Sequence, residues 1–410
     1  MPEALLAGTF DVENYGDLLF PLVAQARLAS AGIAVRPVSP TAGRVGYADA
    51  LPPVAAAAML DADDIKACGV LIGGGYIVIG QAASTLAEYA AAGVAGHAYP
   101  SLWLGATLAG ALRDVPVVWN APGVPFPFAS PRRPMLAAML AAADYVALRD
   151  TASAELLATP GIDIAVVPDT VFDLPMVWST GALRETRLAV LQRHGVAPEA
   201  RLLALHVRER ALGGAGAAGI AAGINTLAAA HGLLPVLLPL GRSLGDGPVA
   251  AAVATHLAVP HMVFDDAASL REMAGVIAGA ALYVGGSMHG YVTAAAYGVP
   301  GVLVAIPAHR KFSGVLAHLD RPRDLARDWP QAFDRAGAWL ATGEGPALPV
   351  AIGAALDRHW GRIVGALGQP EAARDRRLAF LRSYLRAGAQ AGGAAWLVGP
   401  QLAGGLPVAG

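Results

Sequence analysis

Cysteine is nearly absent from the sequence, since Cys68 is the only one in 410 residues. A single cysteine excludes an intramolecular disulfide and a multi-cysteine metal site. Charge is scarce as well: charged residues make up 15% of the chain, and the formal net charge is −2. This balance gives no electrostatic basis for binding nucleic acid or an anionic membrane surface. Lysine is rarer still, with only Lys66 and Lys311 among 29 basic residues, so each remaining lysine gains some weight as a functional candidate.

A long, uninterrupted apolar run is also missing. The best candidate for a membrane span is Ala211 to Leu240, which is uncharged apart from His231. Several glycines interrupt its first half, and Pro235 and Pro239 interrupt its second half, so we expect a helix followed by a buried strand. The start, MPEALLAGTF, lacks the basic region and the cleavage pattern of a signal peptide. These features predict a cytoplasmic protein without a transmembrane segment.

Apolar runs, turns and amphipathic stretches alternate to about residue 310, which is typical of parallel sheets with helical crossovers. We expect an α/β fold with two doubly wound, Rossmann-like domains that face a cleft, the architecture known as GT-B. The expected domains are residues 1–180 and 195–345. Residues 346–410 should form C-terminal helices and a Gly/Ala-rich tail. After residue 320 we expect helices only, and the tail should be poorly ordered from Ala387.

The predicted strands fall into two series. They are Leu5–Gly8, Val70–Ile72, Pro116–Trp119, Tyr145–Leu148 and Ala165–Val167, then Leu202–Val207, Leu233–Leu238, His261–Phe264, Leu282–Val284 and Val299–Ile306. Ligands bind beyond the carboxyl ends of such strands, so reactive side chains at those ends are the candidate site residues.

The first candidate is the segment Asn14-Tyr15-Gly16-Asp17, which follows the first predicted strand. Asp17 has two interpretations. It either caps a helix that begins there, or its carboxylate orients or deprotonates a substrate hydroxyl.

The second candidate is Arg149, at the tip of a strand. Its guanidinium could clamp a phosphate or a carboxylate, or it could simply pair with Asp150.

The third candidate is the segment Ser287-Met288-His289-Gly290, which follows a strand and opens a helix. Ser287 is the expected N-cap, and backbone N–H groups there can hold an anion. His289 should lie in the first turn, where a bound phosphate would favour its protonated form and the helix N-terminus would oppose it. Such a balance suits a group that transfers protons.

The remaining candidates are less distinctive. Lys311 lies in the loop His309-Arg310-Lys311-Phe312 after the last predicted strand, and Arg208 follows the first strand of the second series, together with His206. Gly74, in a glycine triplet, permits close approach of a ligand but does not form a P-loop or a dinucleotide fingerprint. We find no metal-site spacing, and we expect no metal and no cofactor.

In this order, the motifs resemble the polysaccharide pyruvyltransferase family. They are Asn14-x-Gly16-Asp17, Gly73-Gly74-Gly75, Arg149-Asp150-x-x-Ser153, Val167-Pro168-Asp169, Ser287-x-His289-Gly290, Gly298-Val299-Pro300 and Lys311-Phe312. The resemblance implies a GT-B-like fold and transfer of the enolpyruvyl group of phosphoenolpyruvate to two sugar hydroxyls. The product would be a pyruvate ketal in a cell-surface polysaccharide or glycoconjugate, and phosphate would be released.

The resemblance also implies roles for individual residues. His289 would protonate the donor, Asp17 would act on the acceptor, and Arg149 and Lys311 would hold the anionic donor. Asn14, Ser287, Gly74 and Arg208 are further substrate-binding candidates. The first domain would bind the acceptor, and the second would bind the donor.

The sequence departs from the family at one point. Many members carry an arginine between the serine and the histidine, with one more residue in the spacing, whereas here only Met288 separates Ser287 from His289. Two other functions therefore stay open: a GT-B glycosyltransferase that uses a nucleotide-sugar donor, and an inactive sugar-binding protein. The expected partners are phosphoenolpyruvate and a sugar or glycan, with no nucleic acid, and a homo-oligomer is compatible with the sequence.

Overall fold

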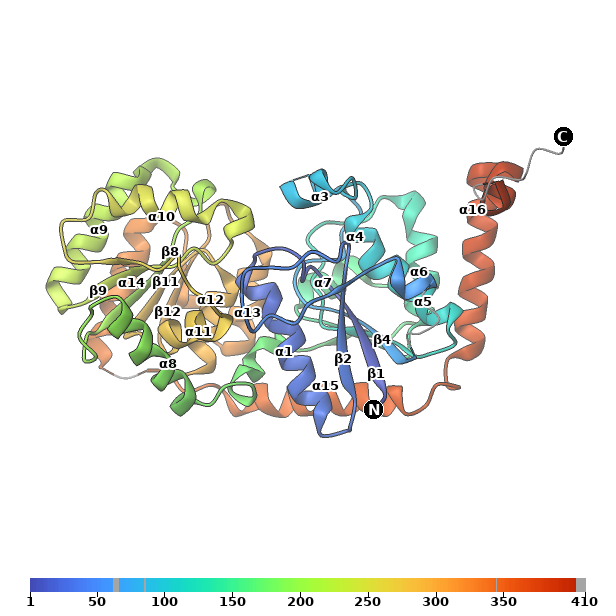
Figure 1. Ribbon diagram of the computed structural model, residues 1–410, viewed down its shortest axis with the longest axis horizontal. Helices are drawn as coiled ribbons and strands as arrows, with labels where there is room; N and C mark the ends of the chain where they lie inside the picture. Colours follow the sequence, from blue (N-terminus) through green and yellow to red (C-terminus); the bar gives the residue numbers. More distant parts are fainter. Residues whose placement is uncertain (62–65, 85, 344, 403–410) are drawn as a thin grey trace.

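The computed structural model describes residues 1–61, 66–84, 86–343 and 345–402, and it contains two separate sheets. The first sheet has the strand order β3-β2-β1-β4-β5-β6-β7 and the second has the order β10-β9-β8-β11-β12-β13. The named strands pair in parallel throughout. In each sheet the order proceeds outward in both directions from a central strand, which is the doubly wound arrangement. The expected α/β fold with two Rossmann-like domains is therefore confirmed (Figure 1).

The first half of the chain builds the first sheet and its helices. The strands are β1 (Glu3–Ala7), β2 (Ala34–Ser39), β3 (Val54–Ala55), β4 (Ala67–Gly73), β5 (Val117–Asn120), β6 (Tyr145–Leu148) and β7 (Ala165–Val166). The helices are α1 (Tyr15–Ala29), α2 (Ala58–Asp61), α3 (Ala87–Ala91), α4 (Ala98–Pro100), α5 (Ala106–Leu112), α6 (Arg133–Ala142) and α7 (Thr151–Leu157). A 3₁₀ segment, η3 (Thr170–Met176), and helix α8 (Thr180–Arg193) lead to the second sheet.

The second sheet has a corresponding set of elements. Its strands are β8 (Leu202–His206), β9 (Leu234–Leu237), β10 (Met262–Val263), β11 (Leu282–Gly285), β12 (Gly301–Val304) and β13 (Leu325–Ala326). Its helices are α9 (Gly216–His231), α10 (Asp246–Ala254), α11 (Leu270–Ala278), α12 (Met288–Ala296), α13 (Arg310–Leu319) and α14 (Trp329–Thr342).

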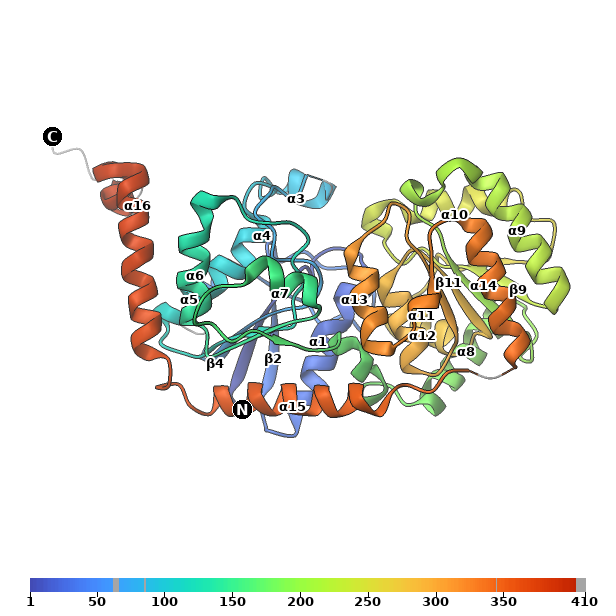
Figure 2. The same cartoon turned by 180° about the vertical axis from the view of Figure 1, so that it is seen from behind.

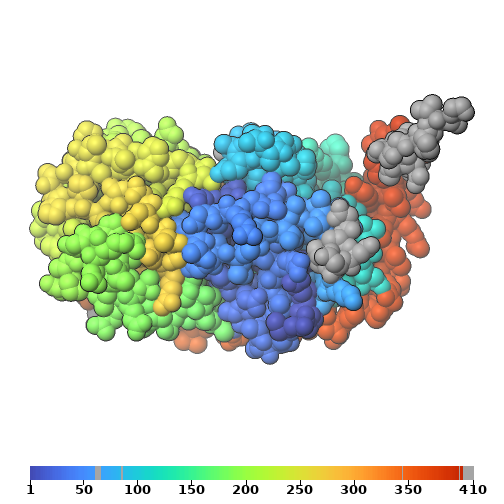
Figure 3. Space-filling view, viewed as in Figure 1, coloured from blue at the N-terminus to red at the C-terminus, as the bar shows by residue number. Residues whose placement is uncertain are grey.

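Successive side chains on the central strands β1 and β8 point to opposite faces of their sheets and therefore enter different hydrophobic cores. Leu6 of β1 enters a core that also contains Ala204 of β8, so this core is shared by both sheets. Leu5 enters a second core on the outer face of the first sheet, and Leu203 enters a third core on the outer face of the second. The shared core explains why the two domains meet along a continuous surface in the space-filling view (Figure 3).

The last two helices return to the first domain. Helix α15 (Val350–Leu367) packs against β5, β6, α1 and η3, and α16 (Arg374–Leu402) packs against α5 and α6. In Figures 1 and 2, α15 runs beneath the first domain and α16 stands at its far end. Ile352, Leu356 and Trp360 lie four residues apart on the buried face of α15, which is the spacing of an amphipathic helix.

Several sequence expectations need correction. The expectation of only helices after residue 320 is wrong, because β13 adds a strand beside β12. The sequence pattern does not indicate β2, because Arg36 and Pro37 interrupt its apolar residues. The tail that we expected to be poorly ordered from Ala387 is helical to Leu402 on both sides of a kink at Gly393, while residues 403–410 lie outside the described part.

The long apolar stretch forms a helix and a strand, α9 and β9, as expected. Within the described residues, no helix is long and apolar enough to cross a membrane. The proposed domain limits at residues 180 and 195 stay a prediction.

Candidate active site

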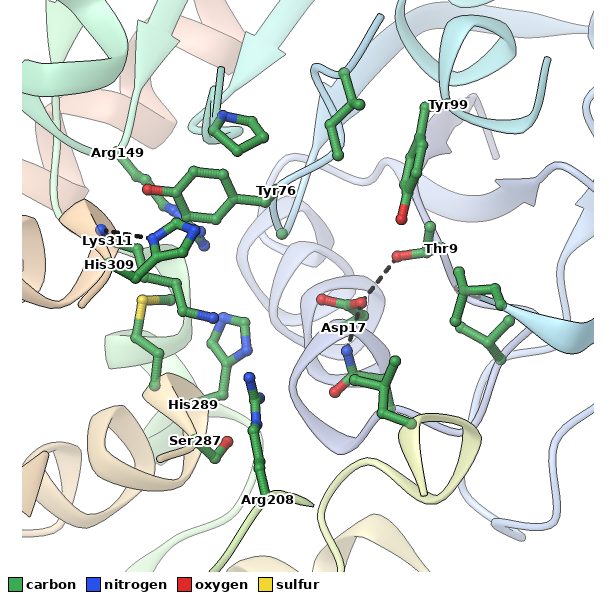
Figure 4. Close-up of a pocket in the computed structure, with 18 of the residues that line it drawn as sticks. Thr9, Asp17, Tyr76, Tyr99, Arg149, Arg208, Ser287, His289, His309 and Lys311 are labelled. Atoms are coloured by element: carbon green, nitrogen blue, oxygen red, sulfur yellow. Dashed lines mark hydrogen bonds between the residues drawn. The ribbon is translucent and has the colours of Figure 1, made fainter. Parts of the chain in front are cut away.

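A cavity of about 270 Å³ lies between the two domains, beyond the carboxyl ends of strands from both sheets (Figure 4). It brings together seven of the eight candidate residues, which come from the loops after β1, β6, β8, β11 and β12 and from the first turns of the helices that follow them. These seven are Asn14, Asp17, Arg149, Arg208, Ser287, His289 and Lys311. Cations gather on one wall, and the Asp17 carboxylate lies on the opposite wall (Figure 4).

The cationic wall combines Arg149, Arg208, Arg210 and Lys311. In the described chain, the Lys311 ammonium makes neither an ion pair nor a hydrogen bond, and it lies 5.2 Å from the ring centroid of Phe312. Burial, followed by the charges of the three arginines, holds the pKa of Lys311 well below its usual value. An anion bound here would supply the counter-charge that the wall lacks.

Arg149 is buried at the tip of β6, with only 4% of the residue exposed. Its guanidinium carbon lies 4.0 Å from the ring centroid of Tyr76, and its Nη1 lies 3.4 Å from Oδ2 of Asp169. Its Nε lies 4.0 Å from Oδ2 of Asp150, and Asp150 itself caps α7 by accepting from the backbone N–H of Ser153. Among the described residues, Arg149 therefore has only weak carboxylate partners, so part of its hydrogen-bonding capacity remains available to a ligand.

His289 lies in the first turn of α12, as predicted. Its Nε2 is buried and lies 3.4 Å from Oδ2 of Asp169, an ion-pair distance without hydrogen-bond geometry. Burial would raise the pKa of Asp169, but the neighbouring His289 and Arg149 outweigh it, so the pKa lies below its usual value. Because Nε2 faces Asp169, Nδ1 is the ring nitrogen that remains available to the cavity.

Close packing across the two domains holds this imidazole in place. A Cβ added to Gly16 in the first turn of α1 would lie 1.8 Å from Nδ1 of His289. One turn further along α1, the Phe20 ring packs edge-on against His289 at 5.2 Å between centroids. Next to them, the Tyr15 hydroxyl lies 3.1 Å from Oγ1 of Thr293 on α12. The absence of a side chain at Gly16 is therefore what allows His289 to approach α1.

Asp17 is oriented by side chains and does not cap a helix. The N-cap of α1 is Asn14, and Asp17 lies inside the first turn, so the capping interpretation is wrong. The Thr9 hydroxyl and the Asn14 amide both donate to Oδ2 of Asp17, at 2.9 and 2.8 Å. Within the described chain, Oδ1 accepts no hydrogen bond, and Figure 4 shows one carboxylate oxygen directed toward the cationic wall. This oxygen is free to accept a hydrogen bond from a substrate.

Of the eight candidates, Gly74 is the one that is not part of the described lining of the cavity. Its backbone has a φ of +88° and packs against Phe20, whereas its neighbour Gly75, with a φ of +66°, forms part of the wall. A Cβ on Gly75 would lie 2.8 Å from Oδ1 of Asp17.

Two other candidates have structural roles. His206 is fully buried, and its Nε2 lies 2.7 Å from Oδ2 of Asp246. Ser287 both caps α12, by accepting from the backbone N–H of Gly290, and lines the cavity.

The structure adds site residues that the strand-end argument did not select: Thr9, Tyr76, Tyr99, Asp169 and His309. Asp169 belongs to the Val167-Pro168-Asp169 motif, and His309 precedes Lys311 in the segment expected to be a loop, but neither pattern indicates a contact. The expected loop is wrong, because α13 begins at Arg310 and contains Lys311. Tyr76 directly follows the glycine triplet, which is the one sequence signal that could have directed attention to it. No group of three or more metal-ligating side chains occurs in the portion of the chain that the structure covers.

Solved structures resemble the chain in fold. One is UDP-GlcNAc 2-epimerase from Methanocaldococcus jannaschii, with a TM-score of 0.51, 14% identity, and coverage of 89% of this chain and 99% of that chain. Another is UDP-GlcNAc 2-epimerase from Neisseria meningitidis, with a TM-score of 0.49, 12% identity, and coverage of 94% and 100%. A third is ADP-heptose lipopolysaccharide heptosyltransferase II from E. coli, with a TM-score of 0.45, 12% identity, and coverage of 84% and 99%. At such low identities, the likeness concerns the fold alone.

Sequence comparison is more specific. No curated protein matches the chain. A model of the family described as polysaccharide pyruvyl transferase matches residues 14–307, which is more than half of the chain. The matched range includes Asp17, Arg149 and His289 and ends shortly before Lys311. The chain therefore belongs to the polysaccharide pyruvyl transferase family, and it is a transferase.

Proposed function

We propose that this transferase moves the enolpyruvyl group of phosphoenolpyruvate onto two hydroxyls of a sugar, forming a pyruvate ketal and releasing phosphate. The observation that carries the proposal is that one cavity has two chemically different walls. Cations without full counter-charge line one wall, a carboxylate oxygen without a hydrogen-bond donor lies opposite, and an imidazole lies at the same cavity. A donor with a phosphate and a carboxylate suits the first wall, and an acceptor hydroxyl suits the second.

The donor would bind through its charges. Arg149 and Lys311 would hold the phosphate and carboxylate, and Arg208 would add a third cation from the end of β8. Because only Met288 separates Ser287 from His289, without the arginine that many members carry in a spacing longer by one residue, Arg208 is the candidate to supply the missing positive charge. The same contacts would stabilise the negative charge that develops on the departing phosphate.

The first chemical step would be acid-catalysed addition. Nδ1 of His289 would protonate the methylene carbon C3 while an acceptor hydroxyl attacks C2, and Oδ1 of Asp17 would take the hydroxyl proton. Asp169, beside Nε2, would stabilise the charged imidazole before transfer. General acid–base help of this kind is worth about 10²–10⁴-fold in rate.

The second step would close the ketal. The C2–O bond to phosphate breaks, and the electron pair leaves with phosphate. The second sugar hydroxyl then attacks C2. Its proton returns to His289, and the proton held by Asp17 leaves with phosphate, so both side chains recover their starting states.

The direct test measures phosphate release from phosphoenolpyruvate in the presence of sugar acceptors, together with thermal protection by each donor. Phosphoenolpyruvate should raise the melting temperature, and an effective acceptor should release phosphate stoichiometrically with ketal. Protection by a nucleotide sugar but not by phosphoenolpyruvate would replace this proposal with the glycosyltransferase function. Protection by neither donor, with sugar binding retained, would indicate an inactive sugar-binding protein.

A further inference from the structure

The cavity contains a second histidine, His309, which differs from His289 in its hydrogen bonding. His309 is the N-cap of α13, and its Nδ1 accepts the backbone N–H of Lys311 at 3.2 Å. A ring nitrogen that accepts a hydrogen bond carries no proton. The proton of this imidazole therefore lies on Nε2, and the ring is neutral.

The environment of His309 preserves this neutral form. Its ring packs edge-on against Tyr76 at 5.3 Å and beside Phe312 at 6.4 Å between centroids. Burial, followed by the charges of Lys311, Arg149, Arg210 and Arg310, lowers the pKa of His309 to about 4.

The Nε2–H group is left for the cavity. Within the described residues it has no hydrogen-bond partner, and it is not among the buried polar atoms that lack one, so it retains access to open space. His309 lines the cavity between Tyr76 and Lys311 (Figure 4). A neutral N–H donor beside cations adds a directed hydrogen bond without adding further charge repulsion to an already positive wall.

We propose that His309 is a substrate-binding residue whose neutral Nε2–H donates a hydrogen bond to an oxygen of the donor's phosphate group. The proposal rests on the proposed function for the identity of the donor. It gives the two histidines separate tasks: His289 transfers a proton, while His309 keeps its proton and selects an oxyanion. A helix cap is thereby used to fix the tautomer of a ligand-binding side chain.

The tautomer can be tested in the free protein. In ¹⁵N spectra of histidine-labelled protein, with the His309 signals assigned through the His309→Asn variant, we expect a protonated Nε2 and an unprotonated Nδ1 from pH 5.5 to pH 8. A proton on Nδ1, or a titration of His309 near pH 6.5, would overturn the proposal whatever the donor is.

Binding is tested by calorimetric titration with two probes, inorganic phosphate and phosphoenolpyruvate. His309→Asn keeps a capping oxygen but removes the imidazole N–H, so it should retain thermal stability yet weaken binding of both probes by roughly 10- to 100-fold, as expected for a hydrogen bond to a charged group. Asp328→Ala removes the N-cap of α14, away from the cavity, and serves as the control, with loss of stability but unchanged binding.

The outcomes separate this proposal from the proposed function. If the wild type binds phosphate but not phosphoenolpyruvate, the pyruvyl donor is wrong, and the phosphate titration of His309→Asn still decides the role of His309. Binding of phosphate by His309→Asn at wild-type strength would refute that role. So would an equal loss of binding in Asp328→Ala, because the effect would then come from stability alone.

Discussion

Replacing Gly16 with alanine tests how closely the activity depends on the position of His289. The new Cβ would lie 1.8 Å from Nδ1 and 2.3 Å from Cγ of His289, whereas ordinary contacts begin at 3.4 Å. The Cβ of His289 would also lie only 2.6 Å away, so rotation of the imidazole alone does not relieve the contact. Nδ1 and α1 must therefore separate by about 1.6 Å, the difference between 3.4 and 1.8 Å. A misplacement of about 1 Å can cost about 10²-fold in rate, so we expect kcat/KM to fall by at least that factor.

Stability should change much less than activity. Alanine favours a helix over glycine by about 1 kcal/mol, while overpacking costs about 1–3 kcal/mol. Together these effects give a net loss of about 0–2 kcal/mol in the free energy of unfolding. Phosphate release and urea unfolding of the same preparations separate the two effects.

The control for Gly16→Ala is Gly361→Ala on α15, where a Cβ meets no atom of the described residues within 4 Å. This variant should gain up to about 1 kcal/mol of stability and keep full activity. In a His289→Ala background, Gly16→Ala should lose most of its effect on rate, because no imidazole remains to be displaced. The contact with the Cβ at position 289, at 2.6 Å, remains and should affect stability. Wild-type kcat/KM in Gly16→Ala would refute the assignment of His289 to the reaction.

Further substitutions separate the roles within the site. His289→Gln should lower kcat by about 10²-fold or more while calorimetric donor affinity stays nearly intact, and loss of donor binding would make it a ligand clamp. Arg149→Ala should weaken donor binding and also slow turnover, so an unchanged kcat at saturating donor would exclude contact with the departing phosphate. Lys311→Met should raise the melting temperature at pH 7 but weaken donor binding; because burial lowers the pKa of Lys311 in the folded state, the wild type loses stability wherever this lysine is protonated in the unfolded state, and the gain should shrink as the pH approaches 10.5. Asp169→Asn should reduce the free energy of unfolding above pH 3.8, because the lowered pKa of the carboxyl means that its charged form favours the folded state. The difference in unfolding free energy between variant and wild type should disappear as the pH falls through the folded-state pKa.

The sequence was sufficient to predict the alternating fold because most strands are continuous apolar runs followed by turns. Tyr145–Leu148 matches its predicted range, and the other predicted strands lie within a few residues of theirs. The two-residue strands β7 and β10 lie within predicted apolar runs, whereas β3 and β13, of the same length, were missed. No apolar run marks β3 or β13, and both form through pairing with β2 and β12. Tertiary contacts, not local preference, define these elements.

The candidate site was predictable to the extent that reactive side chains follow strands. Asp17, Arg149 and His289 meet at one cavity because strand ends of facing sheets converge there. The partners that orient them could not be found in the same way. The Thr9 hydroxyl donates a hydrogen bond to Asp17 across a turn. Asp169 belongs to the first half of the chain and lies beside His289, which is 120 residues further along the sequence. Such pairings depend on how the domains pack, which no local pattern encodes.

The return of α15 has a consequence for the order of events during synthesis. Trp360 of α15 donates a hydrogen bond to Asp173, and His359 contacts both Asn120 and Tyr145, so the last part of the chain completes the core of the first domain. A ribosome adds about 5–20 residues per second, so roughly 10–40 s separate the appearance of residue 180 from that of α15. Until then, the surface of β5 and β6 that α15 covers stays open to solvent. The first domain to be translated is thus finished only after the second has been made, and truncation before residue 350 would leave it with an uncovered apolar surface.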